Sequence, residues 1–93
     1  MPKLKVLSGS DVLRIFLMLG FQKMAQKGSH IKLVRRISDD TKQILTIPNH
    51  DELDKGTLKA IYRQALRYIP EQDLKSFFYS EWWNYYEKSN RME

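Results

Sequence analysis

A short segment in the first third of the chain combines residue types that could act on a phosphate: Gln26-Lys27-Gly28-Ser29-His30. An imidazole changes its protonation state near neutral pH, so His30 could accept or donate a proton during catalysis. Lys27 and Lys32 flank this histidine and could stabilise the negative charge of a reacting phosphate. Gly28 permits a tight turn and a close approach of the backbone to a ligand, and Ser29 offers a further hydrogen bond. The competing interpretation is a surface histidine at a turn.

The other candidate sites have weaker signals. His50 lies near Asp51 and Asp54, but their spacing matches no recognised metal site, and we expect His50 to shape its loop or to contact a partner. Lys55 and Lys59 are further candidates for phosphate binding because they belong to the basic part of the chain. The sequence has no cysteine, no glycine-rich phosphate loop and no nucleophile elbow. We therefore expect no metal and no cofactor.

The elements that must position these residues follow from periodicity and caps. Ser8 and Asp11 form a capping-box pattern before an apolar helical face, which predicts a helix over about 9–19 that ends at Gly20. Alternating side chains predict three strands at about 21–26, 30–37 and 43–47, and the short connections imply an antiparallel meander. If Ile31 and Leu33 face the core, His30 and Lys32 lie on the opposite, open face.

Two further helices are expected in the second half. Asp54 is a plausible cap for a helix whose apolar face is Leu58, Ile61, Tyr62 and Ala65. Its basic face carries Lys59, Arg63 and Arg67, and the alternative reading of that face is an ordinary solvated helix surface. Pro70 is expected at the first position of a third helix, which we expect to continue through an aromatic-rich segment.

The aromatic segment is unusually dense, since seven of the eleven aromatic residues lie between Phe77 and Tyr86. Read as one helix, it has an apolar arc too wide to be covered by one small domain. We expect part of it, with Trp82, Trp83 and Tyr86 as anchors, to form a homodimer or partner interface. The alternative is a helix wrapped by its own protein with the ring edges exposed.

Composition favours a small basic domain. The formal net charge is +5, with 13 basic and 6 acidic residues in positions 1–67 and 3 basic and 5 acidic residues in 68–93. A basic body suggests an anionic partner, most often a nucleic acid, although a protein that merely has a high isoelectric point is an equal alternative. We expect no signal peptide and no membrane span, and hence a cytoplasmic location.

Several segments, in order, resemble the HicA-type toxins, also called the YcfA family. The resemblance covers about residues 6–66 and rests on Ser8-Gly9-Ser10-Asp11-Val12 leading to Leu19-Gly20-Phe21, Lys27-Gly28-Ser29-His30, Leu45-Thr46-Ile47-Pro48-Asn49-His50 and Asp51-Glu52-Leu53-Asp54-Lys55-Gly56-Thr57-Leu58. The family often has a second histidine after the first, where this chain has Ile31, and the usual Ala-Gly-Ile ending is replaced by Ala65-Leu66-Arg67-Tyr68-Ile69.

The resemblance implies a fold and an activity. It implies an α+β fold like a double-stranded-RNA-binding domain, α-β-β-β-α with a three-stranded antiparallel sheet, formed by residues 1–69. The aromatic residues 70–93 would add a C-terminal helix to the same globular unit. The implied activity is cleavage of mRNA by a toxin that a HicB-like antitoxin neutralises, with His30 as the catalytic histidine.

Two functions from different classes therefore remain open. The first is a metal-independent endoribonuclease in which His30 acts as general acid or base, and in which Lys27, Gly28, Ser29, Lys32, Lys55 and Lys59 bind RNA. The second is a non-catalytic module that binds RNA or docks a partner, as a degenerate toxin would. The two differ in their need for the imidazole of His30, because binding alone should survive its removal.

Overall fold

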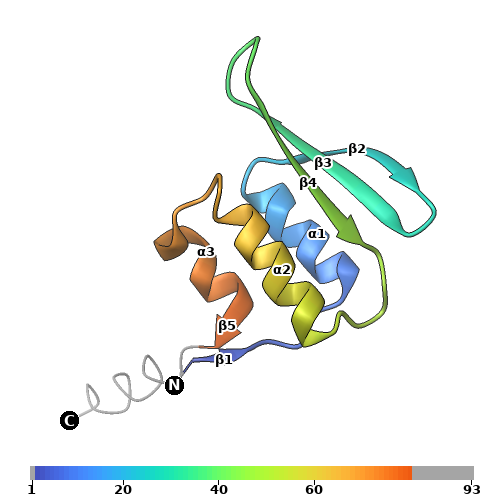
Figure 1. Ribbon diagram of the computed structural model, residues 1–93, viewed down its shortest axis with the longest axis vertical. Helices are drawn as coiled ribbons and strands as arrows, with labels where there is room; N and C mark the ends of the chain where they lie inside the picture. The colour runs from blue at the N-terminus through green and yellow to red at the C-terminus, as the bar shows by residue number, and fades with distance from the viewer. Residues whose placement is uncertain (1, 81–93) are drawn as a thin grey trace.

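The computed structural model describes residues 2–80 of the chain (Figure 1). Along the chain the elements are β1 (Lys3–Leu4), α1 (Gly9–Met18), β2 (Gln22–Lys27), β3 (His30–Arg36), β4 (Lys42–Pro48), α2 (Lys55–Ala65), α3 (Glu71–Phe78) and β5 (Tyr79–Ser80). The helices gather on one side of the sheet formed by β2, β3 and β4 (Figure 1). The predicted α+β class, with an α-β-β-β-α core and an added C-terminal helix, is confirmed.

The main sheet is an antiparallel meander in the order β2-β3-β4, as the short connections predicted. Side chains alternate along its central strand, so that Ile31 and Leu33 are buried against the helices while His30 and Lys32 are exposed on the other face. A bulge interrupts β2 at Met24, between Lys23 and Ala25. The end of the outer face that carries His30 and Lys32 is therefore open, as predicted, whereas Val34 further along the same face is buried.

The caps that set the helix limits are those the sequence indicated. The Ser8 side chain accepts a hydrogen bond from the Asp11 N–H while the Asp11 carboxylate accepts one from the Ser8 N–H, which completes a capping box. Gly20 ends this first helix with a φ of +96°, a left-handed conformation that favours glycine. The Asp54 carboxylate accepts the Thr57 N–H at 2.7 Å and starts α2. Pro70, expected at the first helical position, is instead the N-cap of α3, so this helix begins one residue later, at Glu71.

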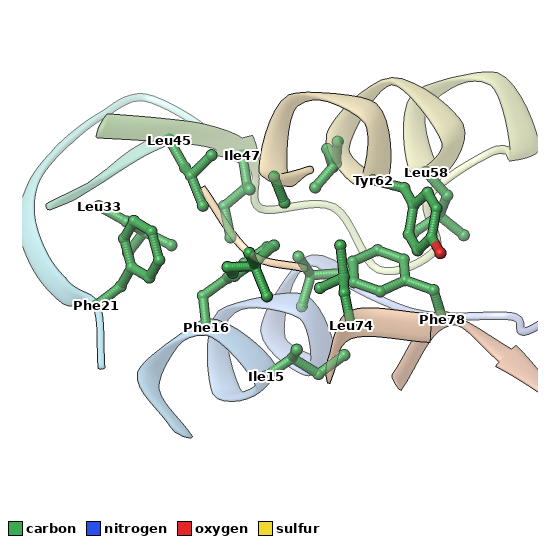
Figure 2. Packing of buried hydrophobic residues seen from close by; sticks show 14 of the residues in the cluster. Ile15, Phe16, Phe21, Leu33, Leu45, Ile47, Leu58, Tyr62, Leu74 and Phe78 are labelled. Atoms are coloured by element: carbon green, nitrogen blue, oxygen red, sulfur yellow. The ribbon is translucent and has the colours of Figure 1, made fainter. Parts of the chain in front are cut away.

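One hydrophobic core joins the sheet to all three helices. Figure 2 shows Phe16, Leu45, Tyr62 and Phe78 directed towards a common interior. The ring of Phe78 lies 6.1 Å from the ring of Phe16 and 5.3 Å from that of Tyr62, centroid to centroid. Since Phe78 and Leu74 are fully buried, α3 belongs to the same core as the sheet.

No helix within residues 2–80 has the length and apolar character needed to cross a membrane.

The third helix differs from the expectation in its extent. It ends at Phe78, and Tyr79–Ser80 instead pairs with Lys3–Leu4 as a two-stranded antiparallel sheet. The prediction that this helix continues through the aromatic-rich segment was therefore wrong at Tyr79–Ser80. The cause is the N-terminal segment, because the Lys5 N–H donates to the Phe78 carbonyl and Lys5 Nζ donates to the Ser76 carbonyl, each at 2.8 Å. Trp82, Trp83 and Tyr86 lie outside the described residues.

Candidate functional site

The turn between β2 and β3 has the geometry that its glycine permits. Gly28 has a φ of +59°, and a side chain there would meet nothing within 4 Å. A glycine with positive φ at the first of two turn residues is typical of a tight β-hairpin. The Gln26 side-chain amide donates to the Gly28 carbonyl at 3.0 Å, which ties the strand end to the turn. The turn is thus held in shape while the surface above Gly28 stays open.

The hairpin brings the histidine and the two lysines of the motif to one place. His30 is the first residue of β3, and its partner directly across the ladder is Lys27 of β2. Lys32 follows two residues later on the same face of the strand, and all three side chains are exposed. An imidazole beside two ammonium groups can exchange a proton with a phosphodiester while the cations stabilise its negative charge.

The other neighbour of His30 is the end of β4. Pro48 pairs with His30 across the ladder, and the Asn49 N–H donates to the Ser29 carbonyl at 2.6 Å. The backbone at His30 is therefore held from both sides. The turn connects it to β2, and the bond from Asn49 to Ser29 connects it to the end of β4. Ser29 contributes its carbonyl to this arrangement, and its side chain is half-buried.

A contact that sequence reasoning missed fixes the segment after β4. Gly9 at the start of α1 donates its N–H to the His50 carbonyl at 2.8 Å. A methyl group on Gly9 would lie 2.6 Å from Asn49 Cα and 2.9 Å from the His50 nitrogen, so only glycine allows this close approach. The residues in contact are forty positions apart, and in the sequence Gly9 looks like an ordinary position in a helix cap.

The predicted phosphate-binding lysines of α2 occupy its first two turns. Lys55 is the first residue of the helix, directly after Asp54, and Lys59 lies one turn further along. Both side chains are exposed. Hydrogen bonding to the Thr57 backbone N–H is the main reason why the pKa of the Asp54 carboxyl is below its usual value. A loop of residues 49–54 separates Lys55 from Pro48, and it links this helix start to the strand end that pairs with His30.

One basic residue that counted toward the charge of the body has a structural role. The Arg35 guanidinium donates to the Leu19 carbonyl at 2.8 Å and to the Tyr68 carbonyl at 3.2 Å, so it joins the end of α1 to the turn that follows α2. It also lies 4.9 Å from the ring centroid of Phe21.

Within residues 2–80, no cluster of three or more histidine, cysteine or acidic residues could hold a metal ion.

Comparison with known proteins gives one match. A family model described as the HicA toxin of bacterial toxin-antitoxin matches residues 9–66, which is 58 of the 93 residues. The matched range begins at the first residue of α1 and ends just after α2, so it contains the sheet, the turn and His30. Neither a curated protein nor a solved structure matches the chain.

Proposed function

The chain belongs to the HicA family of toxins of bacterial toxin–antitoxin systems, and we propose that it is an endoribonuclease that cleaves mRNA with His30. We also propose that a HicB-like antitoxin neutralises it, because a toxin of such a pair needs a partner that blocks its activity. Family membership alone establishes neither the cleavage by His30 nor the antitoxin partner, so each proposal has its own test.

The observation that carries the nuclease proposal is the pairing of His30 with Lys27 at the end of a fixed hairpin. The two residues face each other across the ladder, and both side chains are exposed on the open face of the sheet. A phosphodiester that approaches this face meets a proton-transfer group and a cation together. The neighbouring Lys32 adds a second cation on the same face.

RNA supplies its own nucleophile, so the site needs no covalent intermediate on the protein. In the proposed reaction His30 accepts the proton of the 2′-hydroxyl, and the 2′-oxygen then attacks the adjacent phosphorus. The bond from phosphorus to the 5′-oxygen breaks, and that oxygen takes up a proton, which the now protonated His30 or a water molecule can supply. Lys27 and Lys32 stabilise the additional negative charge on the phosphate in the transition state. The products are a 2′,3′-cyclic phosphate and a 5′-hydroxyl end.

We also propose that the RNA lies along the basic surface around this site. Gly28 and Ser29 let the backbone of the turn approach the RNA, and Lys55 and Lys59 bind flanking phosphates from the first turns of α2. Contacts of this kind read phosphates and helix shape, not base sequence.

The test compares the purified wild type with His30→Ala and Asp39→Ala, using an RNA substrate in excess EDTA. Asp39 is a matched control because it lies exposed in the turn at the other end of the same sheet. We expect wild type and Asp39→Ala to cut and His30→Ala to lose cleavage by about 10²-fold or more, with 2′,3′-cyclic phosphate ends. Circular dichroism should show equal folding of all three.

Other outcomes point elsewhere. Products that carry only 5′-phosphate ends would rule out the 2′-hydroxyl mechanism. If all three proteins bind RNA and none cuts it, the chain is a binding module, and its affinity should then fall with salt in proportion to the number of phosphate contacts. Addition of a purified HicB-like protein should stop cleavage, and unchanged cleavage at saturating partner would reject the antitoxin proposal.

A further inference from the structure

We propose that His50 is a second catalytic residue, which donates the proton to the leaving 5′-oxygen while His30 accepts the proton of the 2′-hydroxyl. The inference rests on the proposed nuclease function and adds to it. Cleavage through a 2′-hydroxyl needs one group to remove a proton and another to supply one, and a single imidazole does both poorly in one step. The fold brings the chain's second histidine to the same end of the sheet.

The ladder between β3 and β4 determines where His50 lies. Pro48 is directly opposite His30, and the Asn49 N–H bond to the Ser29 carbonyl extends the pairing by one residue. β4 ends at Pro48, so His50 lies two residues beyond the paired strand, at the end of the sheet where His30 begins β3. Opposed residues are about 5 Å apart and two residues span about 7 Å, so the two histidine Cα atoms are at most roughly 12 Å apart. Two imidazoles with a phosphate between them can bridge that separation.

The backbone around His50 is fixed although its side chain is exposed. Its carbonyl accepts the Gly9 N–H at 2.8 Å, and three residues later the Leu53 N–H donates to the Leu7 carbonyl at 2.9 Å. Gly9 also packs so closely on Asn49 and His50 that a methyl group would not fit. A catalytic group needs this combination of a held backbone and an accessible side chain.

The charges around the two histidines suggest which one is the acid. On its own loop His50 is followed by Asp51, Glu52 and Asp54, and the first residue of α2 is Lys55. His30 instead has Lys27 across the ladder and Lys32 on its own strand. Lys27 and Lys32 stabilise the negative charge that develops when the 2′-hydroxyl loses its proton. We therefore assign the base role to His30 and the acid role to His50.

The experiment uses two RNA oligonucleotides, one with a normal phosphodiester and one with sulfur in place of the bridging 5′-oxygen. A 5′-thiolate leaves without protonation, so a missing general acid matters little for that substrate. We expect His50→Ala and His50→Gln to slow cleavage of the normal substrate by about 10²-fold or more. We expect both to cut the sulfur substrate within about tenfold of wild type. His30→Ala should remain slow on both.

The controls separate this inference from the function on which it rests. Thermal unfolding of each variant should match wild type, and Asp39→Ala again serves as the distant control. If His50→Gln cuts the normal substrate at the wild-type rate while His30→Ala does not cut, His50 has no catalytic role and the nuclease proposal stands. A His50 defect of equal size on both substrates also overturns the acid role. A wild type that cuts neither substrate removes the nuclease function and this inference with it.

Discussion

Two basic side chains of β3 lie three residues apart and meet opposite surroundings. Lys32 is exposed on the open face, whereas Arg35 is half-buried and its guanidinium donates to one carbonyl at the end of α1 and to one in the turn after α2. Sequence composition counts both as positive charges that could attract RNA. Only the structure shows that Arg35 is already bonded, because its partners Leu19 and Tyr68 lie 16 and 33 residues away. Fewer basic side chains are therefore free to bind a ligand directly than the composition suggests.

Lys27 and Lys42 allow a matched test of the cation next to His30. Both are exposed lysines at strand ends of the same sheet, but Lys27 pairs with His30 and Lys42 pairs with Arg36 at the other end. We expect Lys27→Ala to lower kcat/KM for RNA cleavage by about tenfold, which corresponds to about 1.4 kcal/mol of transition-state stabilisation. Lys42→Ala should change it less than about twofold, since a distant surface charge is largely screened. Equal effects would mean that Lys27 contributes only to the overall positive potential of the protein and does not stabilise the transition state locally.

At the scale of the elements, periodicity and caps predicted what lies within one segment. The capping box of Ser8 and Asp11 and the alternation around Ile31 both have local patterns, and both were found. The pairing of Lys3–Leu4 with Tyr79–Ser80 was not predicted, because a two-residue strand is too short to show a period. The contact of Gly9 with the end of β4 was missed for a similar reason, since no local sequence signal identifies the residues that Gly9 contacts.

That contact gives a prediction for the start of α1. A methyl group on Gly9 would press on Asn49 and His50, so we expect Gly9→Ala to lower the free energy of unfolding by about 1–3 kcal/mol. It should also displace the segment that bonds to Ser29, and so lower kcat in the fraction that remains folded. Gly56→Ala is the matched control, because its methyl group would meet only Asp54 Oδ1 at an ordinary 3.6 Å. Urea unfolding and single-turnover cleavage measure both effects, and equal behaviour of the two variants would contradict the prediction.

The two aspartate caps predict how stability changes with acid. A hydrogen bond from the Ser8 backbone N–H is the main reason why the pKa of Asp11 is lowered from its usual 3.8. A hydrogen bond from the Thr57 backbone N–H likewise lowers the pKa of Asp54. A carboxyl whose folded pKa is lowered adds stability above its unfolded value, and this stability is lost as the pH falls through the folded pKa.

We therefore expect the urea midpoint of the wild type to fall between about pH 5 and pH 2. It should fall less in the Asp11→Asn/Asp54→Asn variant, which has already lost these carboxylates. The control is Asp39→Asn/Asp40→Asn, which makes the same change of charge in a turn away from any helix N-terminus. If the cap variant and the wild type lose stability in parallel, the caps do not cause the acid dependence.

At the scale of the whole molecule, the described structure contains more than the segment that matches the family. The match ends at residue 66, yet α3 follows it and buries Leu74 and Phe78 in the common core. The N-terminal segment holds the end of this helix through Lys5 and pairs with β5. The predicted catalytic hairpin and this added part thus share one core, while the aromatic residues predicted as an interface come after Ser80.

The last prediction concerns those aromatic residues, for which we propose a role in self-association or antitoxin binding. Trp83→Ser removes one large aromatic anchor, and such anchors commonly dominate interface energies. Met18→Ser is the control, because Met18 is 68% exposed on α1 and its loss also removes an exposed apolar side chain. We expect Trp83→Ser alone to lower the molar mass by light scattering, either of the isolated chain or of its complex with a HicB-like protein. Because that mass reports assembly and not cleavage, a wild-type monomer that forms the same complex after Trp83→Ser would refute the interface and leave the nuclease proposal untouched.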